Sequence, residues 1–154
     1  MQIIFRFHRS LTRYDGLLNE WLGSLISAAL RCYVGWQFFN SGLIKLKDWG
    51  ATLSLFRDEY HVPLLPPELA AYMGAGGELL LPVLLFVGLL SRPAAIGLFF
   101  VNLMAVVSYP QLFKFDCPAA LNDHFYWGIL LLVIAAFGAG KLSLDYWLAR
   151  RTAA

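Results

Sequence analysis

Charged residues are scarce in this chain of 154 residues: Asp, Glu, Lys and Arg make up 14% of it, against about 25% in ordinary soluble domains. Apolar residues make up 59%, and the mean hydropathy is +0.62. A water-soluble fold of this length could not bury so much apolar surface, so the composition excludes an ordinary soluble domain. The net charge of +2 gives no reason to expect nucleic acid as a partner. We therefore expect an integral membrane protein whose main partner is the lipid bilayer.

Cysteine and histidine are also rare. Cys32 falls inside an apolar run and Cys117 in a later loop, too far apart for a disulfide, whose Cα atoms lie within about 7 Å of each other. Cys117 could be an exposed thiol that pairs with a partner protein. Because His8, His61 and His124 lie in different segments, we predict no metal site. A nucleophile–histidine–acid set is not visible either, and the sequence leaves open whether the protein is an enzyme.

The N-terminus does not resemble a secretory signal peptide. Its basic residues alternate with apolar ones, and no small-residue cleavage site follows. We interpret residues 1–20 as an amphipathic lead-in that lies at the membrane surface or in the cytoplasm. The transmembrane domain then covers residues 21–148.

Four apolar runs follow, at about residues 22–46, 69–90, 93–109 and 124–140. Each supplies roughly the 17–25 residues that a helix needs to cross a bilayer. Because they lack the alternation of barrel strands, we predict an all-α fold, a four-helix transmembrane bundle. Residues 51–60, ATLSLFRDEY, place apolar and charged side chains on opposite sides of a helix. This pattern predicts a short amphipathic helix in the first outer loop.

The distribution of Lys and Arg predicts the orientation. More of them lie in the N-terminus, the turn at 91–92 and the C-terminus than in the two other loops. Since cytoplasmic loops carry the excess of positive charge, we expect both termini to be cytoplasmic.

Glu78 is the one charge in the apolar stretch YMGAGGELLLPVLLFVGLL, residues 72–90. It lies roughly 13 Å from the start of the second run, at 1.5 Å per residue, and Arg31 lies equally deep in the first run. An unpaired charge there costs at least about 2.5–3.5 kcal/mol. We therefore predict a buried ion pair between Arg31 and Glu78, which either only fixes the helix register or also handles a substrate, a quinone or a proton.

Further polar residues suggest a cavity in the outer half of the bundle. The first run continues from Arg31 with Gln37, Asn40, Lys45 and Asp48, while the third run contributes Asn102 and the fourth His124. Glycines repeat on the first, second and fourth runs at spacings of three and four residues, which is typical of closely packed membrane helices.

Several of these motifs resemble the DoxX family of small bacterial membrane proteins. They are Arg31 followed by Gly35, Phe39 and SGLIKLKDW (41–49), Glu78 followed by GLLSRPAA (88–95), and Asn102-Leu103-Met104-Ala105. The resemblance covers about residues 20–145 and carries over Arg31, Lys45 and Glu78 as motif positions. Residues 52–74, TLSLFRDEYHVPLLPPELAAYMG, and 141–145, KLSLD, resemble the subgroup found beside genes for bufferins, which are modified copper-binding peptides.

The resemblance implies an accessory protein of the bacterial inner membrane that is not an enzyme on its own. It would support the maturation, export or copper-stress function of a modified metal-binding peptide, with partner proteins or a secreted peptide as its partners. The wider family includes a subunit of a thiosulfate:quinone oxidoreductase. The alternative is therefore a quinone-linked redox subunit with a quinone or lipid in the bundle, and a second alternative is a non-catalytic membrane scaffold.

Overall fold

The computed structural model describes residues 12–114 and 119–152, and all regular structure in these ranges is helical. Cys117 and most of the lead-in lie outside the described residues, so the predictions about them stay predictions. The elements are η1 (Thr12–Tyr14), α2 (Asp15–Lys47), α3 (Trp49–Asp58), α4 (Pro67–Val87), α5 (Ser91–Ser108), η2 (Pro110–Phe113), α6 (Ala119–Phe137) and α7 (Leu144–Thr152).

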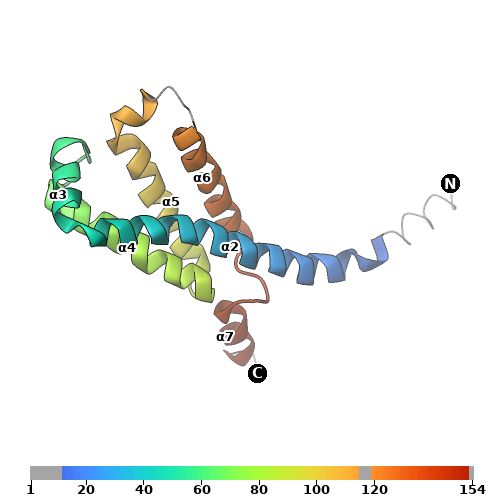
Figure 1. Ribbon diagram of the computed structural model, residues 1–154. Helices are drawn as coiled ribbons and strands as arrows, with labels where there is room; N and C mark the ends of the chain where they lie inside the picture. The colour runs from blue at the N-terminus through green and yellow to red at the C-terminus, as the bar shows by residue number, and fades with distance from the viewer. Residues whose placement is uncertain (1–11, 115–118, 153–154) are drawn as a thin grey trace.

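The long helices form two antiparallel pairs, α2 with α4 and α5 with α6 (Figure 1). The second pair crosses the first at a steep angle, and the pairs are joined by contacts of α4 with α5 and of α2 with α6. Helix α3 packs on α4 at one end of this bundle, where the α2–α4 and α5–α6 connections lie. Helix α7 lies at the opposite end. We call these the α3 end and the α7 end.

Three helices, α4, α5 and α6, are long and apolar enough to cross a membrane. They correspond to the second, third and fourth predicted spans. Helix α2 has 33 residues, and its outer side exposes large apolar side chains such as Leu25, Ile26, Tyr33, Trp36 and Ile44. That surface suits lipid, but a fourth crossing by α2 stays a prediction.

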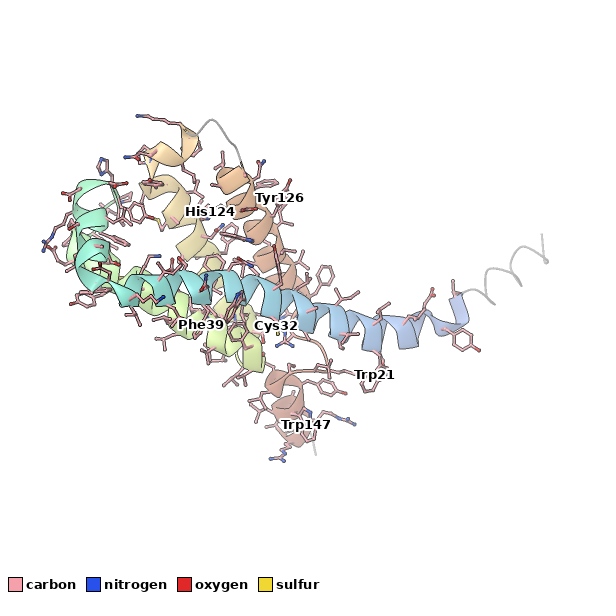
Figure 2. All side chains as sticks on the ribbon, viewed as in Figure 1. Trp21, Cys32, Phe39, His124, Tyr126 and Trp147 are labelled. Atoms are coloured by element: carbon pink, nitrogen blue, oxygen red, sulfur yellow. The ribbon has the colours of Figure 1, made fainter. Side chains whose placement is uncertain are left out.

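The core lies where the two helix pairs cross. Val34 and Phe38 of α2 meet Leu85 of α4, together with apolar residues of α5 and α6. Cys32, which we expected deep in the bundle, is exposed instead (Figure 2). Successive helical residues point about 100° apart, so the side chain that follows the buried Arg31 points away from the bundle.

The turn between α4 and α5 is held by α7. Gly88 ends α4 with φ of +73°, and Leu90 also has a positive φ, of +49°. The Asp145 carboxylate accepts hydrogen bonds from the backbone N–H groups of Leu90 at 2.8 Å and Ser91 at 2.9 Å. Burial acts to raise the pKa of Asp145, but these hydrogen bonds and the nearby Arg31 cation outweigh it and hold the pKa below its ordinary value. The first N–H groups of α5, which have no partner in their own helix, are thus capped from α7.

Gly88→Ala should lower the stability of this turn markedly. A Cβ at this position would lie 2.6 Å from the Cβ and 2.9 Å from the Cα of Ser143. The left-handed backbone alone costs a non-glycine residue about 1–2 kcal/mol. Thermal unfolding in detergent should show a clear drop in melting temperature.

The matched control is Gly76→Ala in the same helix. A Cβ there would meet no atom within 4 Å, and alanine is favoured over glycine in a helix by up to about 1 kcal/mol. Its melting temperature should stay equal or rise. Equal effects of the two substitutions would contradict the close packing at Gly88.

Candidate functional site

A buried ion pair joins α2 and α4 in the half of the bundle nearer the α3 end. Lys45 Nζ lies 2.6 Å and 2.9 Å from the two carboxylate oxygens of Glu78, and 2.9 Å from the hydroxyl of Ser41. The side chains are 14% and 9% exposed. The hydroxyl of Thr52, on α3, donates to the backbone carbonyl of Lys45 and so ties α3 to the same place. The ammonium group thus has three acceptors in a region almost closed to solvent.

The register between α2 and α4 explains why Lys45 is the partner. A Cβ on Gly35 would lie 2.7 Å from the Phe86 ring, and a Cβ on Gly42 would lie 2.8 Å from Leu79. The glycines therefore let these two helix backbones approach closely. In this antiparallel register Glu78 lies opposite the last turns of α2, about two helical turns or more from the level of Arg31.

The predicted pair of Arg31 with Glu78 is therefore wrong, although both residues are buried. Arg31, 1% exposed, donates instead to the carbonyls of Leu85 at 2.7 Å, Leu142 at 2.6 Å and Ala139 at 3.4 Å. The predicted depth of Arg31 rested on a first span that begins near residue 22. Helix α2 instead begins at Asp15 and is about 50 Å long at 1.5 Å per residue. A helix longer than the bilayer is thick does not fix the depth of its residues by counting.

The carbonyls around Arg31 compensate its charge without a direct carboxylate contact. Leu85 is in the last turn of α4, where carbonyls lack partners in their own helix and the helix dipole is negative. Hydrogen bonds to charged groups contribute about 1.5–3 kcal/mol each. Arg31 thus fastens the end of α4 to the segment between α6 and α7.

Asn102 of α5 and His124 of α6 form a second polar pair. The Asn102 amide nitrogen donates to the backbone carbonyl of His124 at 2.8 Å, and its oxygen lies 2.8 Å from His124 Nδ1. The backbone carbonyl can only accept, which fixes the orientation of the amide. Its oxygen can also only accept, so Nδ1 carries the proton and, in the neutral ring, Nε2 has a free lone pair.

A cavity of about 530 Å³ lies between α5 and α6 beside this pair. Apart from Asn102, Asn122 and His124, its lining is apolar: Phe99, Leu103, Val106, Leu121, Phe125, Gly128, Ile129 and Leu132. Four of these side chains are exposed on the outer surface: Leu103, Phe125, Ile129 and Leu132. The volume is in the usual range for small-molecule sites. An apolar molecule in a bilayer could reach the polar pair through this side.

Comparison with known proteins assigns the chain to a family. Residues 26–111 match the DoxX family. The chain belongs to the DoxX family. An uncharacterized protein of Haemophilus influenzae is 32% identical over 130 residues, which cover 80% of this chain and 84% of the relative. No solved structure matches the chain.

The two polar pairs of this DoxX protein are linked through aromatic rings: the Trp127 ring lies 5.1 Å from that of His124 and 5.8 Å from that of Phe38 on α2. Four of the residues singled out from the sequence are thus brought together: Lys45, Glu78, Asn102 and His124. We call these four residues the polar centre. Gln37 is half-buried, Asn40 is exposed, and Asp48 caps α3 by accepting from the N–H of Ala51 at 2.9 Å.

Sequence reasoning missed two residues that matter in the DoxX protein. Tyr60 lies near Glu78, and burial followed by that carboxylate raises the pKa of its hydroxyl to about 12, so it stays a neutral donor. The second is Asp145, which caps α5. Ser-Leu-Asp before aromatic residues is a recognisable helix start, but nothing in the sequence indicates that its carboxylate serves a different helix.

A double-mutant cycle should identify the partner of Glu78. Glu78→Ala alone should lower folded yield strongly, because breaking a buried pair costs about 3–5 kcal/mol. Lys45→Met/Glu78→Leu should recover much of the yield, since it leaves no buried charge. Folded protein can be measured by size-exclusion chromatography of detergent extracts.

Arg31→Met/Glu78→Leu is the control for this cycle. It should fold no better than the worse of its two single variants, because Lys45 and the carbonyls around Arg31 would both lose their partners. If Arg31→Met/Glu78→Leu recovered the folded yield and Lys45→Met/Glu78→Leu did not, the assignment of Lys45 as the partner of Glu78 would be wrong.

Proposed function

We propose that this DoxX protein is an accessory protein of the bacterial inner membrane, not an enzyme on its own, whose polar centre receives the polar part of a membrane-borne partner molecule. The observation that carries the proposal is a buried, side-chain-paired charge between α2 and α4, together with a cavity between α5 and α6 whose lining includes exposed apolar side chains. In such a place polar groups have no water and bind strongly to a ligand that supplies matching groups. Both termini are cytoplasmic in this proposal, so the polar centre lies in the outer half of the membrane.

The partner system in this proposal produces or exports a modified metal-binding peptide that protects against copper. Support comes from the resemblance of residues 52–74 and 141–145 to the bufferin-associated subgroup. In the fold, residues 52–74 form most of α3 and the start of α4, and Thr52 in this stretch donates to the backbone carbonyl of Lys45. A surface at the α3 end is thus the part of the chain that a peptide or partner protein on that side would meet.

Copper tolerance tests whether the ion pair has more than a structural role. In a strain lacking the gene, the folded Lys45→Met/Glu78→Leu variant should fail to restore copper tolerance, because apolar side chains cannot bind a polar group. Tolerance is measured as growth against increasing copper, with membrane levels of the variant matched to wild type.

The matched control for copper tolerance is Arg57→Gln/Glu68→Gln. It removes an ion pair at the same end of the bundle, with N–O distance 2.7 Å but with side chains 53% and 46% exposed. Exposed pairs contribute little to stability, about 0–1 kcal/mol, so this variant should restore tolerance fully. Full tolerance in a well-folded Lys45→Met/Glu78→Leu strain would leave the ion pair with only a scaffold role.

A second candidate function, a quinone-linked redox subunit, is favoured by the cavity between α5 and α6. A quinone has an apolar tail and carbonyl oxygens that need donors. The cavity has a long apolar lining and, at Asn102 and His124, one polar side. His124 in its protonated form could donate to a quinone carbonyl, and in its neutral form could take a proton at Nε2.

Tryptophan fluorescence tests quinone binding directly. The Trp127 ring lies 5.1 Å from the His124 ring, so decylubiquinone in the cavity should quench it with saturation. His124→Phe should weaken binding about tenfold, the equivalent of one hydrogen bond of about 1.4 kcal/mol.

Two controls separate binding from general quenching in the micelle. Trp127→Phe should lose the saturable phase, whereas Trp36→Phe, which removes an exposed ring on the outer side of α2, should keep it. A saturable phase that survives in Trp127→Phe, or that is unchanged in His124→Phe, would exclude the quinone site.

A further inference from the structure

A second cavity, of about 620 Å³, lies at the α7 end, far from the polar centre. It is formed by α2, the segment before α7, and α7 itself. Its lining combines three cations with aromatic and aliphatic side chains: Lys141, Arg150 and Arg151, with Trp21, Leu142, Tyr146 and Trp147. Trp21 and Trp147 are both labelled at this end in Figure 2.

The cations of this cavity carry more positive charge than the described residues around it balance. Lys141 is paired with Glu20 and lies 5.2 Å from the centre of the Trp21 ring. Arg150 lies over the ring of Tyr146 at 5.6 Å. Among the described residues, neither Arg150 nor Arg151 forms a salt bridge. The cavity therefore has a net positive charge and is suited to an anion.

The cavity lies at the level where the apolar exterior of the bundle ends. On α2, exposed Leu22, Leu25 and Ile26 follow Trp21, whereas exposed Leu18 before it stands among the exposed charges of Asp15 and Glu20. Helices α4 and α6 end nearby, at Val87 and Phe137. Exposed Trp147 and Leu148 on α7 add apolar surface at the same level. Tryptophan and tyrosine are enriched where hydrocarbon meets headgroups, so the cavity faces the headgroup layer.

We propose that this α7-end cavity binds the phosphate of an anionic glycerophospholipid, with its acyl chains along the apolar side of α2. Lys141, Arg150 and Arg151 would hold the phosphate, which matches arginine in charge and geometry. The headgroup of a zwitterionic lipid carries a positive charge, which the cations of Lys141, Arg150 and Arg151 would repel. The charge of the cavity therefore favours phosphatidylglycerol over phosphatidylcholine. A soluble acidic peptide would leave the aliphatic and aromatic rim without a matching surface.

Lipid binding here would also act on the bundle, because the cavity is built on α7. Asp145, in the first turn of α7, caps α5 through Leu90 and Ser91. A lipid that holds α7 in place keeps this cap formed. Phosphatidylglycerol should therefore raise the melting temperature of the purified protein more than phosphatidylcholine does.

Native mass spectrometry of the full chain, released from micelles with equal phosphatidylglycerol and phosphatidylcholine, tests the proposal. Wild type should retain phosphatidylglycerol preferentially, and Arg150→Gln/Arg151→Gln should reduce this preference by roughly fivefold per arginine. Arg150→Lys/Arg151→Lys should keep most of it. Equal retention of the two lipids by wild type would overturn the proposal.

Lys47→Gln/Lys114→Gln is the matched control, with the same loss of charge on exposed residues at the α3 end. It should retain phosphatidylglycerol as wild type does. If it lost phosphatidylglycerol as strongly as Arg150→Gln/Arg151→Gln does, the attraction would be non-specific and the proposed site would be wrong. Melting temperature in phosphatidylcholine alone should be the same for all variants. Millimolar inorganic phosphate should not displace the lipid; displacement would mean a site for free phosphate instead.

Discussion

A buried charge in a bundle of apolar helices must find its partners inside the protein, since hydrocarbon offers none. This chain meets the requirement twice on α2, in two different ways. Arg31 is surrounded by backbone carbonyls at the end of α4 and in the segment between α6 and α7. Lys45 binds a carboxylate and a hydroxyl. Arg31 holds α2 at its middle and Lys45 holds it near its C-terminal end, and α2 contacts both α4 and α6.

The two solutions differ in what they leave available for function. The partners of Arg31 are backbone carbonyls, which cannot move away from their helices or change protonation state. The surroundings of Arg31 are therefore suited to holding helices together. Around Lys45 the partners are side chains, which can change partner or protonation state, and in the other helix pair His124 lines a cavity with exposed apolar side chains. A site that exchanges protons or ligands needs such adaptable groups. Side chains that can change partner or protonation state are therefore concentrated in the half of the bundle nearer the α3 end.

Much of this arrangement follows from sequence patterns that depend on local chemistry. Apolar runs located α4, α5 and α6, because length and hydropathy suffice to recognise a membrane-crossing helix. The glycine spacing indicated the close approach at Gly35 and Gly42 for the same reason. The partner of Glu78 could not be predicted, since it depends on the length, tilt and register of α2. The cap of α5 by Asp145 also escaped prediction, because it joins residues 54 and 55 positions apart.

The geometry of Asn102 and His124 shows how a packing contact can also prepare a ring for chemistry. Gly128 packs against this pair, with room for a Cβ at an ordinary contact distance of 3.4 Å from the Asn102 amide nitrogen. The backbone carbonyl of His124 fixes the orientation of the Asn102 amide, and the amide oxygen in turn fixes the proton of the His124 ring on Nδ1. In the neutral ring, Nε2 is then left as an acceptor. Nothing in this chain of contacts requires a ligand. The fold alone therefore presents a defined imidazole next to a cavity with apolar walls, and a molecule entering from the lipid meets that ring in one protonation pattern.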